Sequence, residues 1–156
     1  MLLSTKGRYA VMAMVEIAKQ SGSKPRSLGD VAVRLDLSLA YLEQLFMKLR
    51  RNGLVQSVRG PGGGYVLGRD AYAISICEIM CAVDEPLKMT RCDAEGDGCV
   101  ATKRCSTHFL WEALGAQIEQ FLATATLGDV LYGRYAVPQE EELLLAKLAA
   151  GAEIGQ

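Results

Sequence analysis

The chain has 156 residues, half of them apolar, and its 17 basic and 18 acidic side chains leave a net charge of -1. This length fits about one domain with a small additional element, and the apolar share can fill a core, which excludes a disordered or collagen-like chain. No apolar run approaches the roughly 18 residues of a membrane span, and no apolar segment follows the start, so we expect a soluble cytoplasmic protein. Five cysteines, an odd number, argue against a secreted disulfide framework and favour metal or redox use.

Charge is divided unevenly along the chain. Residues 1–70 hold eleven basic and five acidic side chains, whereas residues 71–156 hold six and thirteen. A basic segment favours a polyanionic partner, because each phosphate that Lys or Arg neutralises releases condensed counterions. Two solvated faces of opposite charge are the alternative, and charge alone leaves both open.

Three helices are predicted in the first third of the chain. The first begins at a Ser4 cap and keeps apolar residues at helical spacing until Gly22. The second begins at Ser27, and the third begins at Ser38 and ends at Gly53. Only a short turn separates the second helix from the third, which is typical of a helix-turn-helix motif.

The third helix is the candidate DNA reader. Its apolar residues, spaced i, i+3, i+4 and i+7, predict a buried face made of Leu42, Leu45, Phe46 and Leu49. The opposite face then carries side chains suited to base edges and phosphates. We expect DNA contacts from this face and its flanks, namely from Ser38, Ala40, Tyr41, Glu43, Gln44, Lys48, Arg50 and Arg51.

A glycine-rich hairpin follows the third helix. Residues 54–58 and 65–67 are predicted as strands around the turn at residues 59–64, RGPGGG. An arginine on such a thin turn can enter a minor groove, so we expect Arg59 and Gly60 to contact DNA. A nucleotide-phosphate cradle would need a helix after the glycines, but here a strand runs through the segment. A plain glycine-rich hairpin is the other alternative to a DNA-binding wing.

Beyond the hairpin, the pattern predicts a helix, a loop and a longer helix. Ser75 with Glu78 resembles a capping box and begins the first of these helices. Residues 89–105 show no periodicity, and a long apolar helix is predicted from about residue 106 to residue 125. Its apolar stripe predicts a dimer seam at Leu110, Leu114, Ile118 and Phe121, with packing inside one chain as the alternative.

Four candidate metal ligands gather around the loop. They are Cys92, Cys99, Cys105 and His108, the only histidine, spaced C-x6-C-x5-C-x2-H. The spacing lacks the paired C-x2-C of structural zinc sites and the C-x2-C-x2-C run of bacterial ferredoxins, so a small iron-sulfur cluster and an atypical zinc site both remain open. Incidental thiols are the third alternative. Cys77 and Cys81 lie four residues apart in an apolar helix, and we interpret them as packing residues.

Several segments resemble winged-helix regulators of the Rrf2 superfamily. They are residues 4–10 (STKGRYA), 41–46 (YLEQLF), 49–50 with 52–55 (LR and NGLV) and 58–65 (VRGPGGGY). Residues 82–85 (AVDE), residues 90–92 (TRC) and the run Cys105-x2-His108-x-Leu110-Trp111 narrow the resemblance to the IscR type. It covers about residues 1–133 and leaves the tail unmatched.

The resemblance implies a homodimeric bacterial transcription factor, a repressor or activator of iron-sulfur cluster assembly genes that binds palindromic promoter operators. It also implies a [2Fe-2S] cluster ligated by three cysteines and one histidine, carried here onto Cys92, Cys99, Cys105 and His108. The gap between the first two of these ligands, Cys92 and Cys99, is one residue longer than in the family's usual pattern. In sister branches that sense nitric oxide or redox state, the first helix supplies a carboxylate ligand. This chain has Arg8 at the matching position, which argues against those branches.

Together these patterns predict a mainly α fold with a small β-hairpin wing. The predicted parts are a winged helix-turn-helix DNA-binding domain (1–70), a linking helix with the cluster-binding loop (71–105), a dimerisation helix with a short capping helix (106–133) and a tail (134–156) that is either a loose helix or disordered. A redox carrier, a sister-branch regulator that senses iron-sulfur clusters, redox state or nitric oxide, and a zinc-stapled adaptor remain as alternative functions. No enzyme is expected, because the single histidine is assigned to the metal and no Ser or Cys has a base partner.

Overall fold

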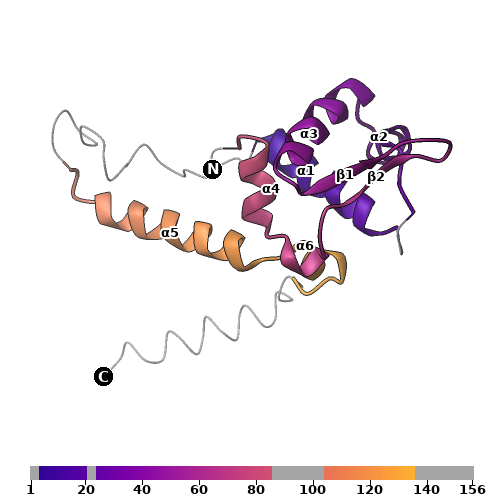
Figure 1. Ribbon diagram of the computed structural model, residues 1–156. Helices are drawn as coiled ribbons and strands as arrows, with labels where there is room; N and C mark the ends of the chain where they lie inside the picture. The colour runs from indigo at the N-terminus through magenta and orange to yellow at the C-terminus, as the bar shows by residue number, and fades with distance from the viewer. Residues whose placement is uncertain (1–3, 21–23, 86–103, 136–156) are drawn as a thin grey trace, which may run out of the picture.

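The computed structural model describes residues 4–20, 24–85 and 104–135. Its elements in chain order are α1 (Thr5–Ala18), α2 (Leu28–Leu35), α3 (Leu39–Arg51), β1 (Val55–Val58), β2 (Gly64–Leu67), the 3₁₀ helix η1 (Ala71–Ala73), α4 (Ile76–Ala82), α5 (His108–Thr124) and α6 (Leu127–Leu131). The predicted class, mainly α with one antiparallel hairpin, is confirmed. Figure 1 shows α1 to α4 and the hairpin gathered together, while α5 extends away from them.

Hydroxyl caps begin the helices where the sequence predicts. The Ser27 side chain accepts a hydrogen bond from the Asp30 backbone N–H at 3.1 Å, which starts α2. Ser38 caps α3 in the same way, at 3.2 Å from the Tyr41 N–H. Ser75 and Glu78 form a reciprocal capping box at the start of α4. Each cap satisfies an N–H that the first helical turn leaves without an intrahelical partner.

The turn between α2 and α3 is short because α2 ends abruptly. Asp36 adopts a left-handed conformation with φ 53°, and the Leu37 N–H bonds back to the Ala32 carbonyl at 3.0 Å. An aspartate tolerates this conformation better than most residues other than glycine. The chain therefore leaves α2 and enters α3 within three residues, as a helix-turn-helix requires.

The core lies beneath α3, against α1, α2 and α4. Its largest side chains include Met14, Leu42, Phe46 and Leu49, all without solvent exposure. Burying a side chain of this size contributes about 1.5–3 kcal/mol. The apolar face of α3 is therefore committed to the core, which fixes the direction of its polar face.

The hairpin is joined to the helices by a bridge that the sequence pattern did not predict. Tyr65 of β2 exchanges two backbone hydrogen bonds with Arg26, at 2.8 and 3.0 Å. Gly64 permits this approach, because a Cβ there would lie 2.2 Å from the Arg26 carbonyl oxygen. The wing is thus fastened to the segment that leads into α2.

The end of α5 returns to the core, while its start projects outward. The Ile76 N–H donates a hydrogen bond to the Ala125 carbonyl, and the Leu127 N–H donates one to the Ile74 carbonyl, both at 2.8 Å. These bonds join the start of α4 to the segment between α5 and α6, where Leu127 is fully buried. Towards the other end of α5, Leu110 is 61% exposed. None of the helices in the described part of the chain is long and apolar enough to cross a membrane.

The packing interpretation of Cys77 and Cys81 is wrong for Cys81. That thiol is exposed and Cys77 is only half-buried. The buried face of the seven-residue helix α4 is formed instead by Ile76, Ile79 and Met80. Periodicity alone could not place the cysteines, because two turns of a helix rich in apolar residues allow several faces.

Candidate functional site

The outward face of α3 carries the polar side chains predicted to read DNA. Glu43 and Gln44 are exposed, as are Ser38 and Ala40 at the start of the helix. Because Leu42, Leu45 and Phe46 are buried to 2% exposure or less, this face cannot turn inward. A second helix that presents polar groups in this way suits insertion into the major groove.

Tyr41 is held at the edge of this face. Its ring packs edge-on against Tyr9 of α1, with centroids 6.2 Å apart and an interplanar angle of 88°. Burial raises the pKa of Tyr41, and the nearby Tyr9 and Glu85 raise it further. The phenol therefore stays protonated at neutral pH and can donate a hydrogen bond to a phosphate oxygen.

Lys48 has an acidic partner outside its own helix. Its Nζ lies 2.6 Å from Oδ2 of Asp84, and Lys6 Nζ donates to the Asp84 backbone carbonyl at 2.8 Å. The hydrogen bond from Lys48 and its charge lower the pKa of Asp84. The segment that follows α4 is thereby fastened to α3 and to α1.

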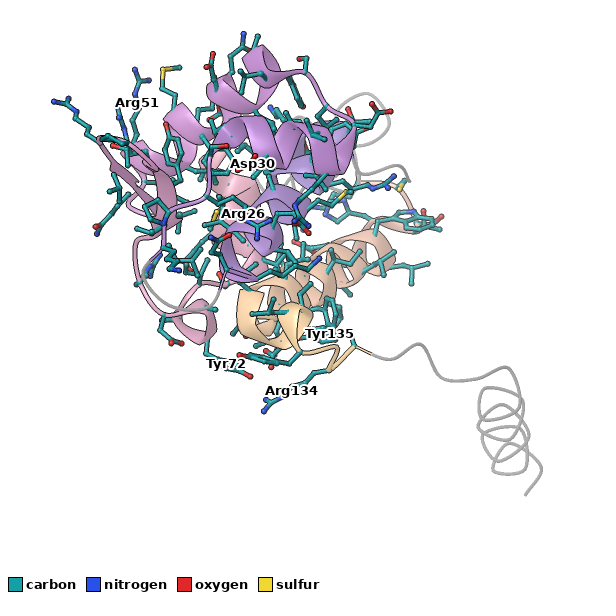
Figure 2. The ribbon with its side chains drawn as sticks, turned by 90° about the vertical axis from the view of Figure 1, so that its right-hand side faces the viewer. Arg26, Asp30, Arg51, Tyr72, Arg134 and Tyr135 are labelled. Atoms are coloured by element: carbon teal, nitrogen blue, oxygen red, sulfur yellow. The ribbon has the colours of Figure 1, made fainter. Side chains whose placement is uncertain are left out.

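The wing tip and the end of α3 present further basic groups. Arg59 and Gly60 are exposed at the turn, and Gly60 has φ 113°, a conformation that favours glycine. Arg50 and Arg51 are exposed in the last turn of α3. Figure 2 shows Arg51 at the end of the molecule where the hairpin lies, opposite Arg134 and Tyr72.

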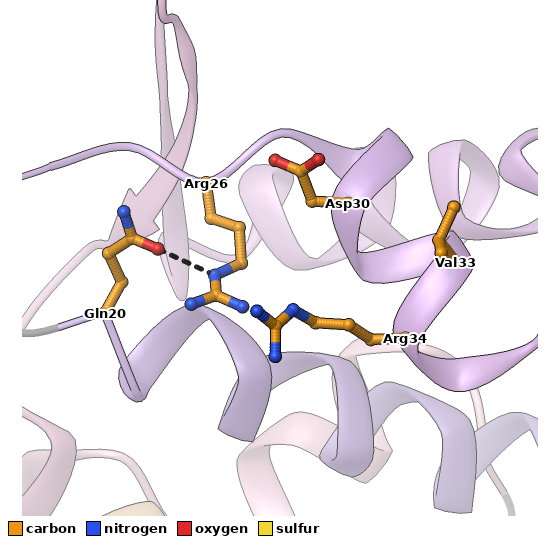
Figure 3. A pocket seen from close by; sticks show the side chains of 5 residues that line it. All are labelled: Gln20, Arg26, Asp30, Val33 and Arg34. Atoms are coloured by element: carbon orange, nitrogen blue, oxygen red, sulfur yellow. Dashed lines mark hydrogen bonds between the residues drawn. The ribbon is translucent and has the colours of Figure 1, made fainter.

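A carboxylate that the sequence reading missed holds α1 and α2 together. Glu16 is buried and faces three cations, with Lys19 at 2.6 Å, Arg26 at 3.3 Å and Arg34 at 3.9 Å. The guanidinium groups of Arg26 and Arg34 lie next to one another (Figure 3). Both residues line a cavity of about 380 Å³. The only sign of this contact in the sequence was that an acidic residue, Glu16, stands within the apolar pattern of the first helix.

Two of the four predicted metal ligands lie at the start of α5. The His108 backbone N–H bonds to the Cys105 carbonyl at 3.1 Å, and the His108 side chain is 1% exposed. The imidazole Nε2 lies 3.9 Å from a carboxylate oxygen of Glu112, and Cys105 is half-buried. Cys92 and Cys99 lie outside the described residues. Within residues 4–20, 24–85 and 104–135, no three His, Cys, Asp or Glu side chains are arranged to hold a metal ion.

A helix-turn-helix with an exposed polar face, followed by an antiparallel hairpin, defines the winged-helix class of DNA-binding proteins. The model of the Rrf2 family, described as an iron-dependent transcriptional regulator, matches residues 3–133. The chain is 53% identical over 131 residues to the HTH-type transcriptional regulator IscR of Vibrio cholerae, which covers 84% of this chain and 75% of the relative. IscR of Escherichia coli K12 is 50% identical over 131 residues, with 84% and 80% covered.

A solved structure agrees with these relatives. The structure titled T. potens IscR has a TM-score of 0.69 and 34% identity, covering 91% of this chain and 96% of that one. The chain therefore belongs to the Rrf2 family, and it is a DNA-binding transcription regulator of the IscR type.

Proposed function

We propose that this regulator holds a [2Fe-2S] cluster through Cys92, Cys99, Cys105 and His108, and that cluster status controls its action at iron-sulfur cluster assembly genes. The observation that carries the proposal is the position of His108, which is buried in the first turn of α5, three residues after Cys105. Three thiolates and one imidazole are a donor set that iron accepts. When bound, the cluster provides a metal centre whose occupancy depends on how many iron-sulfur clusters the cell can supply.

The chain's own residues explain why such a centre would be labile. Each thiol must lose its proton to ligate, and His108 must be neutral. An imidazole is a weaker, protonatable ligand than a thiolate, so the His108 corner would be the first to open. Glu112, 3.9 Å from Nε2, lies where it can interact with that nitrogen when the ligand is released.

The two ends of the ligand segment are tied to different parts of the fold, which supports coupling to DNA. On one side Asp84 contacts Lys48 of the reading helix. On the other side Cys105 lies three residues before His108, the first residue of α5. Ligation would fix the segment between them and, with it, the spacing of two reading helices in a dimer.

We further propose that α5 joins two copies of the chain, giving a homodimer matched to palindromic operators. Leu110, Leu114 and Phe121 are 61%, 42% and 55% exposed, and Ile118 is half-buried. Exposed large apolar side chains in a row on one helix indicate a surface that a partner covers.

The proposed DNA-contacting residues are Ser38, Ala40, Tyr41, Glu43, Gln44, Lys48, Arg50, Arg51, Arg59 and Gly60. The division into parts at residues 70, 105 and 133 belongs to the same proposal, and no catalytic role is assigned to any residue. Because the structure describes only residues 134 and 135 of the predicted tail, its remainder lies outside the described residues.

A triple variant tests the proposal. Replacing Cys92, Cys99 and Cys105 by Ala should leave a folded protein without iron or sulfide, which anaerobic visible spectroscopy and metal analysis detect. Its affinity for some promoter fragments should fall by about 1–3 kcal/mol relative to the parent at one salt concentration. Equal affinity on every fragment would show that the cluster is not the signal. A colourless parent protein that contains zinc would favour the zinc-stapled alternative instead.

A further inference from the structure

Two thiols outside the proposed cluster ligands lie side by side on α4. The Sγ atoms of Cys77 and Cys81 are 3.9 Å apart. Cys81 is exposed and Cys77 is half-buried, so solvent can reach the pair in the single chain. Neither thiol belongs to the core or to the DNA-reading face, and the function described above uses neither.

The separation of the two sulfurs suits chelation of one ion. With metal–sulfur bonds of about 2.3 Å, as for zinc thiolates, one ion can contact two sulfurs up to about 4.6 Å apart, and these sulfurs lie 3.9 Å apart. Residues four apart on a helix face the same side, so neither backbone nor helix must move to bring both sulfurs to the ion. The site is therefore already formed as a two-sulfur clamp.

A disulfide fits the same pair poorly. It would need the sulfurs to close to about 2.05 Å and the Cβ atoms to lie about 3.5–4.5 Å apart. Cβ atoms four residues apart on a regular helix lie about 5–6 Å apart. Oxidation would thus distort α4, and α4 packs against α1, α3 and α5.

The electrostatic surroundings favour a cation. Burial raises the pKa of Cys77, as do the neighbouring Cys81 and the carboxylates Glu119 of α5 and Glu78 of α4. At neutral pH the Cys77 thiol therefore keeps its proton, and a thiol reacts slowly as a nucleophile. A metal ion must displace the thiol protons when it binds, and its positive charge then offsets part of the negative charge that the thiolates place beside both carboxylates.

We propose that Cys77 and Cys81 form a binding site for a soft monovalent cation, Cu(I). Soft thiolate ligands select Cu(I), zinc and iron-sulfur centres among the metals of proteins. Zinc almost always takes four ligands, and the described residues offer no group of three His, Cys, Asp or Glu side chains arranged for a metal. Cu(I) is satisfied by two thiolates. On binding, two S–H bonds break, two Cu–S bonds form, two protons pass to solvent, and no electron is transferred.

The first experiment uses the full-length protein as isolated under nitrogen. One equivalent of Cu(I) is supplied from a weak competing chelator, bicinchoninate, and Zn(II) is used in parallel. Alkylation by iodoacetamide followed by peptide mass spectrometry then reports the accessibility of each cysteine. We expect Cu(I) to protect Cys77 and Cys81 together, and Zn(II) to protect neither. If Cys77 and Cys81 are alkylated equally fast with and without Cu(I), the site does not exist.

Matched variants separate this site from the cluster ligands. Cys77→Ser and Cys81→Ser should each weaken Cu(I) binding by at least about 100-fold, since chelation by a second thiolate is lost. The variant lacking the thiols of Cys92, Cys99 and Cys105 should keep the Cu(I) protection of the α4 pair. If Cu(I) binding is lost in that triple variant and retained in Cys81→Ser, the ion belongs to the cluster ligands and the proposal is wrong.

Discussion

Lys48 of the reading helix and Asp84, the second residue after α4, form an ion pair of 2.6 Å across 36 residues of sequence. Lys48 is one of the residues expected to contact DNA, yet in the free chain its ammonium group already has a carboxylate partner. Asp84 adopts a left-handed conformation with φ 54° and also receives Lys6 at its carbonyl. Asp84, which precedes the segment of the proposed metal ligands, thus restrains one of the proposed DNA-contacting residues.

Asp84→Asn should release Lys48 and strengthen binding to nonspecific DNA. A lysine freed from a carboxylate can neutralise one further phosphate, so the slope of log K against log salt should steepen by about 1. Fluorescence anisotropy at several salt concentrations measures this slope. Glu119→Gln on α5 changes the net charge by the same amount away from α3 and should keep the parent slope. Equal slopes for Asp84→Asn and the parent would show that the pair does not restrain Lys48.

Arg59→Ala tests the wing. The side chain is exposed on the hairpin turn, where it can enter a minor groove. We expect specific operator binding to weaken by about 1–3 kcal/mol. Arg134→Ala removes one positive charge far from Arg51 at the end of α3 (Figure 2) and should leave operator affinity nearly unchanged. If both variants bind as tightly as the parent, the wing assignment fails.

Leu114→Glu tests the dimer seam. Leu114 is 42% exposed in the single chain, so a charge there should not unfold it. Within a dimer, however, the charge would be buried without a partner, at a cost of about 3–5 kcal/mol. Sedimentation velocity should then show a monomer with unchanged circular dichroism. Ala116→Glu, on another side of α5, should stay dimeric. A parent protein that sediments as a folded monomer would contradict the proposal.

The features that the sequence predicted well are local. The caps at Ser27 and Ser38 and the wing turn each depend on a few adjacent residues, so their chemistry is visible in the chain. The direction of the α3 polar face followed from one strong apolar repeat. These local signals were sufficient to predict the winged helix-turn-helix and the outward direction of the polar face of α3.

The features that sequence reading missed join distant segments. The bridge from Arg26 to Tyr65 and the pair Lys48–Asp84 connect residues 39 and 36 positions apart, and no spacing rule predicts such partners. The exposure of Cys81 was missed for a related reason: which side of a short helix is buried depends on the neighbouring elements. The α4 dithiol pair was therefore visible only after folding.

The last prediction concerns acid stability and Glu85. This side chain is 5% exposed and accepts a hydrogen bond from the Ser4 backbone N–H at 3.0 Å and another from the Ser4 hydroxyl. Burial alone would raise the pKa of Glu85, but the hydrogen bonds from Ser4 and from the Gly7 N–H, with the charge of Lys6, outweigh it and lower the pKa. The folded protein therefore holds this carboxylate ionised more strongly than the unfolded chain does.

Linkage gives the sign of the pH effect. A lowered folded pKa contributes stability that is present above the unfolded glutamate value of about 4.3 and is lost as pH falls through the folded pKa. Glu85→Gln should therefore reduce the free energy of unfolding by about 1–3 kcal/mol near pH 7, because hydrogen bonds to a charged group are lost. Urea unfolding should show this difference shrinking as the pH falls below the unfolded value, where the parent also becomes protonated. Ser4→Ala, which removes the hydroxyl donor instead of the acceptor, should reduce the same pH-dependent part. A difference between parent and Glu85→Gln that stays constant down to acid pH would show that the ionised carboxylate does not stabilise the junction of α1 with the end of α4.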